Sequence, residues 1–316
     1  MILITGVAGF IGSCTAECFI KRGFPVVGID NFDSFYSRSV KEKNISWLKS
    51  HHLFSFLEGD LNDVAFMNSI TQPVSAVIHL AAKAGVQPSL LQPLQYIHNN
   101  IQGTNNLLEW MKRRNIRKML FASSSSVYGN NNTIPFSESD ADIYPVSPYA
   151  FTKRSCELLN HTYHHLYGMD IINLRFFTVY GPRQRPDLAI YKFTNAIHNG
   201  LPIKLFGKGD TQRDYTFVDD IVQGIFNAYE YLMSNNSIFD TFNLGNNSPI
   251  SLLHLVELIE NVVGKTAIRE HLPEQPGDMR ITYASIDKAK KILNYNPSTS
   301  IEEGLKIFYQ WYLTHQ

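Results

Sequence analysis

Short runs rich in β-branched and aromatic residues alternate with longer stretches of mixed polar and apolar residues over the first half of this chain. The runs predict strands at residues 2–4, 25–29, 54–58, 76–79, 118–123 and 171–176. The stretches between them predict helices over residues 11–22, 63–70, 96–113 and 148–167. This alternation predicts an α/β fold with a doubly wound parallel sheet of the Rossmann type.

Glycine and proline punctuate shorter elements after residue 175, which predicts a smaller C-terminal lobe. We expect residues 1–175 to form the main domain and residues 176–215 and 246–316 to form the lobe. Residues from about 216 to 245 should return to the main domain, because Asp219 and Asp220 resemble the cap of a helix. Within the predicted helix 96–113, Leu107, Leu108, Trp110 and Met111 fit either the core or a dimer seam.

Positive and negative side chains balance among the 316 residues, with 28 Lys plus Arg against 28 Asp plus Glu. This balance argues against a nucleic-acid partner. No apolar run approaches the ~18 residues of a membrane span, so no membrane association is expected. Cys14, Cys18 and Cys156 are too few and too unevenly spaced for a disulfide framework or a metal cage. We therefore expect no metal and a reducing, cytoplasmic location.

A glycine pattern at Gly6, Gly9 and Gly12 follows the first predicted strand and opens the first predicted helix. Such glycines permit a tight turn and a close approach of the backbone to a pyrophosphate, whose charge rests on the helix N-terminus. Asp30 ends the second strand, where a carboxylate bonds an adenosine ribose and repels a 2′-phosphate. NAD is therefore favoured over NADP, although Arg38 in the following polar loop keeps NADP open.

Ser147 and Pro148 have the sequence pattern of an N-cap and a first helical residue, which places Tyr149 at the start of a helix. Lys153 lies one turn further on the same face. A helix dipole, an ammonium and an oxidised nicotinamide would each lower the pKa of the Tyr149 phenol, which makes it a credible general base. Ser124, at the end of an upstream strand, supplies a hydroxyl.

In this order, these features resemble the extended short-chain dehydrogenase/reductases of the nucleotide-sugar epimerase and dehydratase branch, over essentially the whole chain. The matching stretches are residues 6–12, 79–82, 123–129, 149–153, 174–182, 213–220 and 276–284. The resemblance implies that Tyr149 is the base, Ser124 its hydroxyl partner and Lys153 the clamp on a nicotinamide ribose. It also implies a tightly held NAD in contact with Gly6, Gly9, Phe10, Ile11, Gly12, Asp30, Asn31, Asp60, Leu61, Leu80, Ala81, Ala82, Lys83, Tyr149, Lys153 and Phe176.

Ser125 and Ser126 occupy the two places where dehydratases of this branch carry an Asp-Glu pair. Loss of the sugar 6-hydroxyl needs an acid and a base, so dehydration is disfavoured. Decarboxylases of the branch usually carry a glutamate there and are disfavoured as well. Simple epimerisation needs no further acid.

Residues 178–187 and 191–193 resemble the UDP-glucuronate 4-epimerases. The resemblance implies that Arg185 faces the sugar carboxylate, for which an arginine fork is well suited. Thr178, Ser125 and Ser126 would add neutral hydrogen bonds. Together with Arg185, they would hold the carboxylate away from the geometry in which carbon dioxide is lost. The other predicted substrate contacts are Lys192, Phe193, Phe206, Arg213 and Asp278. Nearby Arg280 is either a displaced phosphate contact or a surface charge.

The sequence therefore predicts an NAD-dependent epimerase that interconverts UDP-glucuronate and UDP-galacturonate. Oxidation at carbon 4 would be followed by return of the hydride to the opposite face. UDP-glucose 4-epimerase is the nearest alternative, followed by a UDP-glucuronate decarboxylase and by a non-catalytic NAD-binding protein of the same fold. A homodimer is implied by the family resemblance alone.

Overall fold

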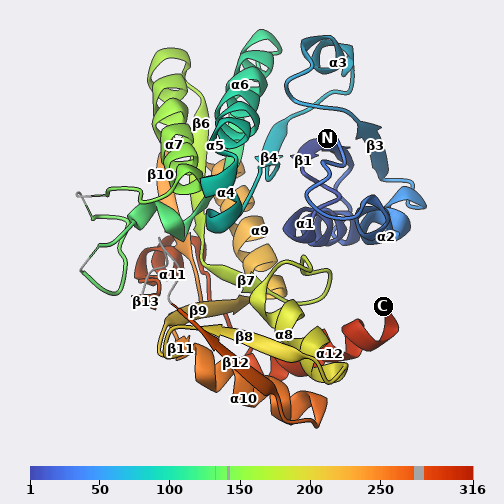
Figure 1. Cartoon of the computed structure of the whole chain (residues 1–316). Helices are drawn as coiled ribbons and strands as arrows, with labels where there is room; N and C mark the ends of the chain where they lie inside the picture. The colour runs from blue at the N-terminus through green and yellow to red at the C-terminus, as the bar shows by residue number, and fades with distance from the viewer. Residues whose placement is uncertain (132, 141–142, 274–280, 316) are drawn as a thin grey trace.

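The computed structural model describes the chain except for residues 132, 141–142, 274–280 and 316. Its centre is a seven-stranded parallel sheet with the strand order β10-β6-β5-β4-β1-β2-β3 (Figure 1). This order is that of a Rossmann sheet with one added strand, so the predicted fold class is confirmed. The strands are β1 (Ile2–Thr5), β2 (Val26–Asp30), β3 (Phe54–Glu58), β4 (Ala76–His79), β5 (Lys118–Ser124), β6 (Asp170–Phe176) and β10 (Phe239–Leu244).

Helices cover both faces of this sheet, and two separate apolar clusters lie between helices and strands. One face carries α1 (Phe10–Lys21), α2 (Arg38–Lys49) and α9 (Val218–Ser234). The other carries α3 (Val64–Ser69), α6 (Gly103–Arg113) and α7 (Pro148–Tyr167). Because both faces are covered, β1, β2, β4 and β6 are buried along their whole length, and β1, β2 and β4 are mostly apolar in sequence.

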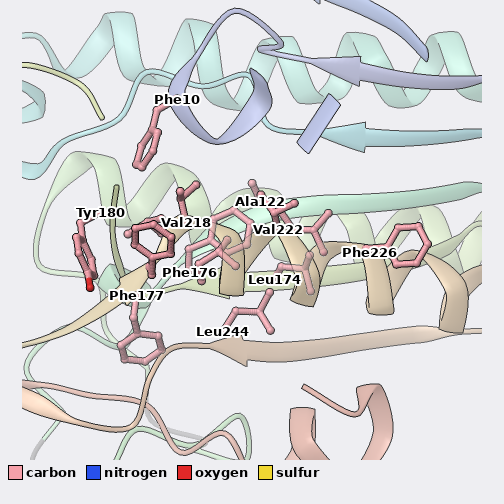
Figure 2. Close-up of a cluster of buried hydrophobic side chains, with 14 of the residues drawn as sticks. Phe10, Ala122, Leu174, Phe176, Phe177, Tyr180, Val218, Val222, Phe226 and Leu244 are labelled. Atoms are coloured by element: carbon pink, nitrogen blue, oxygen red, sulfur yellow. The ribbon is translucent and has the colours of Figure 1, made fainter. Parts of the chain in front are cut away.

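Figure 2 shows the core on the α9 face of the sheet. Leu174 and Leu244, from the paired strands β6 and β10, lie near Val222 of α9, and Phe226 lies further along the same helix. The same cluster continues through Phe177 toward the C-terminal lobe. The returning segment thus supplies both an edge strand of the sheet and a covering helix, while the exact domain boundaries stay a prediction.

The C-terminal lobe lies below the sheet in Figure 1 and contains two small sheets. The order β11-β9-β13 forms one, with β7 also paired to β9, and β12 pairs with β8 in the other. These elements are β7 (Thr178–Tyr180), β8 (Pro202–Phe206), β9 (Gln212–Phe217), β11 (Pro249–Ser251), β12 (Ile268–Leu272), β13 (Ile281–Thr282), α8 (Ala189–His198), α10 (Leu252–Val263) and α12 (Ile301–Thr314). A further helix, α11 (Asp287–Leu293), follows β13.

The predicted helix over residues 96–113 is interrupted. The chain forms the short helices α4 (Val86–Leu91) and α5 (Pro93–Tyr96), then the π-helix η1 (Ile97–Gln102), and only then α6. Within the π-helix, the Asn100 side chain accepts a hydrogen bond from Lys83 N and donates to Lys83 O. The wider helical turn therefore coincides with a side chain bonded to the loop after β4.

Two further expectations are settled by burial and by helix ends. Leu107, Leu108, Trp110 and Met111 are at most 1% exposed, so they belong to the core and the dimer-seam alternative is wrong. Asp219 and Asp220 do not cap α9, because the helix begins at Val218 and they lie in its first turn. Asp220 instead accepts hydrogen bonds from the backbone N–H groups of Ser298 and Thr299, each at 3.1 Å.

The start of α7 is as predicted. Ser147 Oγ accepts a hydrogen bond from Ala150 N at 3.2 Å, and Pro148 is the first helical residue. The helix ends at Gly168, whose φ of 63° is left-handed. Within the part of the chain that the structure describes, no helix is long and apolar enough to cross a membrane.

Candidate active site

A cavity of about 770 Å³ opens at the carboxyl ends of the central strands, between the sheet and the C-terminal lobe. Ligands bind at this place in doubly wound sheets. Every residue predicted to contact the cofactor lines the cavity. Of the predicted substrate contacts, those in the lining are Ser125, Ser126, Thr178, Arg185, Lys192 and Arg213.

The remaining predicted substrate contacts lie elsewhere. Phe193 is 8% exposed and belongs to the apolar core rather than to the cavity wall. Phe206 ends β8 and is not among the described residues that line the cavity. Asp278 and Arg280 lie outside the described residues. The structure thus brings together the cofactor set and most of the sugar-binding set.

The glycine turn after β1 is packed too tightly for side chains. Gly6 has a left-handed φ of 70°, and a Cβ there would lie 2.8 Å from the backbone of Ala81. A Cβ on Gly12 would lie 2.1 Å from the carbonyl oxygen of Gly6. Gly6 therefore lets the turn after β1 approach the loop after β4, and Gly12 lets the first turn of α1 close on that turn.

Asp30 fixes this turn as well as lining the cavity. Its Oδ2 accepts a hydrogen bond from Ala8 N at 3.0 Å, and its Oδ1 accepts one from Phe32 N at 2.8 Å. Burial raises the pKa of the Asp30 carboxyl, and the nearby Lys41 ammonium acts in the opposite direction. The carboxylate keeps further lone pairs for a ligand.

Arg38 is committed elsewhere. Its Nη1 and Nη2 donate to the two carboxylate oxygens of Glu58, each at 2.7 Å, and its Nε donates to Glu42 at 2.8 Å. Arg38 is also not among the described residues that line the cavity. Because Arg38 is bound to these two glutamates, it no longer supports the NADP alternative.

The three predicted catalytic residues meet in the cavity wall. The Ser124 hydroxyl is close enough to the Tyr149 phenol to act on its pKa, which it lowers. Ser124 Oγ also accepts from Ser126 N at 3.2 Å and from Ser126 Oγ at 2.9 Å. This chain of hydroxyls connects the end of β5 to the first turn of α7.

The pKa of the Tyr149 phenol is shifted opposite to the expected direction. Burial raises it, and this effect exceeds the lowering by the Ser124 hydroxyl and the Arg185 charge. The Lys153 ammonium donates a hydrogen bond from Nζ to Ala122 O at 2.6 Å rather than to the phenol. Burial lowers the pKa of Lys153 to about 8.

A buried ion pair holds α7 against the sheet below these residues. Glu157 accepts from Arg175 Nε and Nη2, each at 2.9 Å, and from Ser123 Oγ at 2.6 Å. Both side chains of the ion pair are 3% exposed. Burial acts to raise the pKa of Glu157, but the hydrogen bonds and charge of Arg175 bring it below its usual range.

Some cavity residues were not predicted. Asp33, Phe35, Tyr36 and Lys41 come from the segment after β2, and Asp187 follows Arg185 by two positions. The Tyr36 hydroxyl is buried and has no hydrogen-bond partner among the described residues. An orphaned hydroxyl in the wall, together with the side-chain-free glycine turn, fits a cavity that holds a polar ligand such as a dinucleotide. Their closeness in sequence to Asp30 and Arg185 was the feature that could have indicated that these residues line the cavity.

The chain is similar in sequence to known proteins over nearly its whole length. The GDP-mannose 4,6 dehydratase family model matches residues 3–308. A UDP-glucuronate 4-epimerase from Thermodesulfobacterium geofontis is 44% identical over 312 residues, which cover 98% of this chain and 95% of the relative.

Solved structures agree with this relationship. The UDP-glucuronic acid 4-epimerase of Bacillus cereus, in complex with UDP-glucuronic acid and NAD, has a TM-score of 0.92 at 35% identity and covers 100% of this chain and 99% of its own. The UDP-glucose 4-epimerase of Thermotoga maritima, with UDP-glucose, has a TM-score of 0.89 at 31% identity and covers 99% and 98%. The chain therefore belongs to the GDP-mannose 4,6 dehydratase family of extended short-chain dehydrogenase/reductases.

Proposed function

We propose that this protein interconverts UDP-glucuronate and UDP-galacturonate by NAD-dependent epimerisation at carbon 4. The observation that carries the proposal is a single cavity that is lined by the glycine turn, by Arg185 and by the Ser124–Tyr149–Lys153 group. The full-length similarity to UDP-glucuronate 4-epimerases supports it.

The residues at the sheet end of the cavity fit NAD. The first turn of α1, at Phe10, Ile11 and Gly12, offers backbone N–H groups to a pyrophosphate, and Asp30 offers carboxylate oxygens to a ribose. The commitment of Arg38 to two glutamates favours NAD over NADP. When bound, NAD supplies a nicotinamide ring that takes up a hydride and gives it back.

Tyr149 Oη is the atom that takes the proton of the sugar 4-hydroxyl. The Ser124 hydroxyl and the positive charge of Arg185 both favour the phenolate over the phenol. Lys153 is held by Ala122 O with its remaining N–H groups available to ribose hydroxyls. The same phenol returns the proton to the epimerised alcohol, so no further acid is required.

The sugar end of the cavity contains groups that suit a uronate. Arg185 lines it with Thr178, Ser125 and Ser126, which offer donors to a carboxylate. Holding the carboxylate in one orientation keeps its carbon–carbon bond out of alignment with a ketone at carbon 4, which suppresses loss of carbon dioxide. Lys192 and Arg213, which also line the cavity, are proposed contacts of the nucleotide part of the substrate.

UDP-glucose 4-epimerisation is the second candidate. It is favoured by the existing ion pair between Arg185 and Asp187, because a neutral sugar needs no further cation. The serines at positions 125 and 126 disfavour a decarboxylase, and the assembled Ser124, Tyr149 and Lys153 disfavour a non-catalytic role.

We also propose a cytoplasmic homodimer. The thiols of Cys14, Cys18 and Cys156 are unpaired, as in a reducing compartment.

Exposed apolar side chains gather on α4, α5, the π-helix and α7, which contact one another. They are Leu90, Leu91, Leu94, Ile97, Phe151, Leu158, Leu166 and Tyr167. An uncovered apolar face of this kind fits the same face of a second copy.

The dimer is tested by Leu94→Glu combined with Leu158→Glu. Two charges on the apolar face should separate the copies, so sedimentation velocity should show the 36.0 kDa monomer in place of a particle of twice that mass. Leu313→Glu on α12 is the matched control, since Leu313 is 50% exposed and lies outside this face. A wild-type protein that sediments as a monomer contradicts the proposal.

The epimerase activity is tested with UDP-glucuronate and UDP-glucose in separate incubations with NAD. UDP-galacturonate should form from the first without UDP-pentose, as resolved by anion-exchange chromatography. Tyr149→Phe should lower kcat by about 10²- to 10⁴-fold because the proton acceptor is lost, with NAD affinity retained. Turnover of UDP-glucose alone would replace the first candidate by the second.

Arg185→Ala should raise KM for UDP-glucuronate at least about tenfold, because a charge-assisted bidentate pair is lost. UDP-glucose serves as the matched control substrate, and its KM should change little. The product mixture should also contain a larger fraction of UDP-pentose. If neither the uronate KM nor the pentose fraction changes, Arg185 has no role in carboxylate recognition.

The buried Lys153 should make the stability of the protein depend on pH. Its pKa is about 8 in the folded protein and 10.5 as its usual value, so between these values the unfolded chain holds a proton that the native state has lost. Stability should therefore rise with pH across this window, by ~2–3 kcal/mol in all. Urea unfolding of Lys153→Met at pH 7.5 and pH 10.5 should lack this rise relative to wild type. Lys112→Met, at an exposed lysine, should follow the wild-type dependence.

A further inference from the structure

Arg185 and Asp187 form an ion pair inside the cavity. Arg185 Nε donates to Asp187 Oδ1 at 2.8 Å, and Arg185 Nη2 donates to Asp187 Oδ2 at 2.7 Å. Arg185 is 17% and Asp187 33% exposed, and both line the cavity. The carboxylate therefore occupies one edge of the guanidinium, the edge formed by Nε and Nη2.

The opposite edge of the guanidinium is left for a second carboxylate. A guanidinium carries five N–H groups, of which Asp187 takes two. Both N–H groups of Nη1 and the second one of Nη2 remain. One N–H from each of these nitrogens forms the end-on edge, which can bind a carboxylate in a bidentate manner while Asp187 stays in place.

The ion pair is built into the local backbone. Pro186 stands between the two residues with a fixed φ, and Leu188 N donates to Arg185 O at 3.2 Å to close a turn. The turn leads directly into α8. The position of Asp187 relative to Arg185 is therefore set within four residues and does not require a ligand.

An aromatic ring also contacts the same guanidinium. The Arg185 guanidinium carbon lies 5.0 Å from the centre of the Phe35 ring, within the range of a cation–π contact. Phe35 belongs to the segment after β2, at the cofactor end. Arg185 is thus restrained by a carboxylate in its edge plane and by an aromatic face beneath it.

The contacts with Asp187 and Phe35 affect the binding of an anion by Arg185 in two opposite ways, one electrostatic and one entropic. The charge of Asp187 partly cancels the attraction of Arg185 for an anion. A free arginine side chain, however, loses about 2 kcal/mol of rotamer entropy when it is fixed, and Asp187 and Phe35 impose that loss before the sugar arrives. An already oriented end-on edge also fixes the plane of the bound carboxylate.

We propose that Asp187 is a positioning residue that orients Arg185, so that its end-on edge recognises a sugar carboxylate and gives the site its preference for uronates. This inference rests on the proposed function. In the bound state, Arg185 then lies between two carboxylates, one from the protein and one from the substrate, with Phe35 against its face.

The test is binding of UDP-glucuronate and UDP-glucose to the NAD-loaded protein by isothermal titration calorimetry. Asp187→Asn removes the charge while keeping the shape, and it should weaken UDP-glucuronate binding about tenfold and UDP-glucose binding less than about twofold. The fraction of UDP-pentose among the products should rise. Asp187→Glu, which keeps a carboxylate, should recover part of the uronate preference.

The Arg185→Ala background separates orientation from other effects. There, Asp187→Asn should no longer weaken UDP-glucuronate binding, because no guanidinium is left to orient and one repelling charge is removed. Glu42→Gln is the matched control, since it breaks an arginine–carboxylate contact outside the cavity and should leave both affinities unchanged.

Two results would overturn the inference. Tighter UDP-glucuronate binding by Asp187→Asn would mean that Asp187 only competes with the substrate. An equal loss for both sugars would mean that the change acts on the fold or on the nucleotide site. A wild-type protein with no preference for UDP-glucuronate would instead overturn the proposed function, before any variant is compared.

Discussion

The buried carboxylate of Glu157 fixes the geometry on which the rest of the site depends. It joins α7 to two neighbouring strands, through Ser123 of β5 and Arg175 of β6. Glu157 lies four residues after Lys153 and eight after Tyr149, on the same helix face. Leaving one partner of such a pair alone in the interior costs about 3–5 kcal/mol, so the helix has one stable position on the sheet. That position brings the Tyr149 phenol to Ser124, the residue after Ser123.

The burial that orders the Ser124–Tyr149–Lys153 group also disfavours the charged forms of Tyr149 and Lys153. The pKa of Tyr149 is raised and that of Lys153 is lowered, so both shifts favour the neutral phenol and amine. The proposed chemistry needs the phenolate. Arg185 is the charged side chain whose field favours it, and the same guanidinium is the proposed partner of the sugar carboxylate. Substrate recognition and proton removal therefore share one cation.

The sequence was sufficient for the parts of the fold that local patterns determine. The buried strands are short apolar runs between turns, and α7 carries its cap, its proline and its final glycine within the sequence. Helix α2 was missed because its residues are largely polar and few of them are buried. The π-helix at residues 97–102 was missed because it coincides with bonds from Asn100 to Lys83, a contact that no local pattern contains.

The same division holds for the candidate site. The glycine turn and Asp30 were predicted because strand, turn and helix follow one another along the chain. The raised pKa of Tyr149 was not predicted, because burial depends on residues brought together from several strands and the lobe. Phe206 and Phe193 were assigned by resemblance, yet an aromatic residue can serve the core as well as a ligand, and Phe193 packs in the core.

The segment after β2 is the part of the chain that links the cofactor side of the cavity to Arg185. Asp33 pairs with Lys83 at 3.4 Å, and its carbonyl accepts from Lys41 at 2.7 Å, which ties the segment to the cofactor end. Two residues later, Phe35 lies against Arg185 at the sugar end. The Ser124–Tyr149–Lys153 group suits the oxidation of many alcohols, whereas in the proposed function this segment and the Arg185–Asp187 pair select the sugar. The proposed orientation of the carboxylate therefore depends on elements that are distant in sequence and meet only in the folded chain.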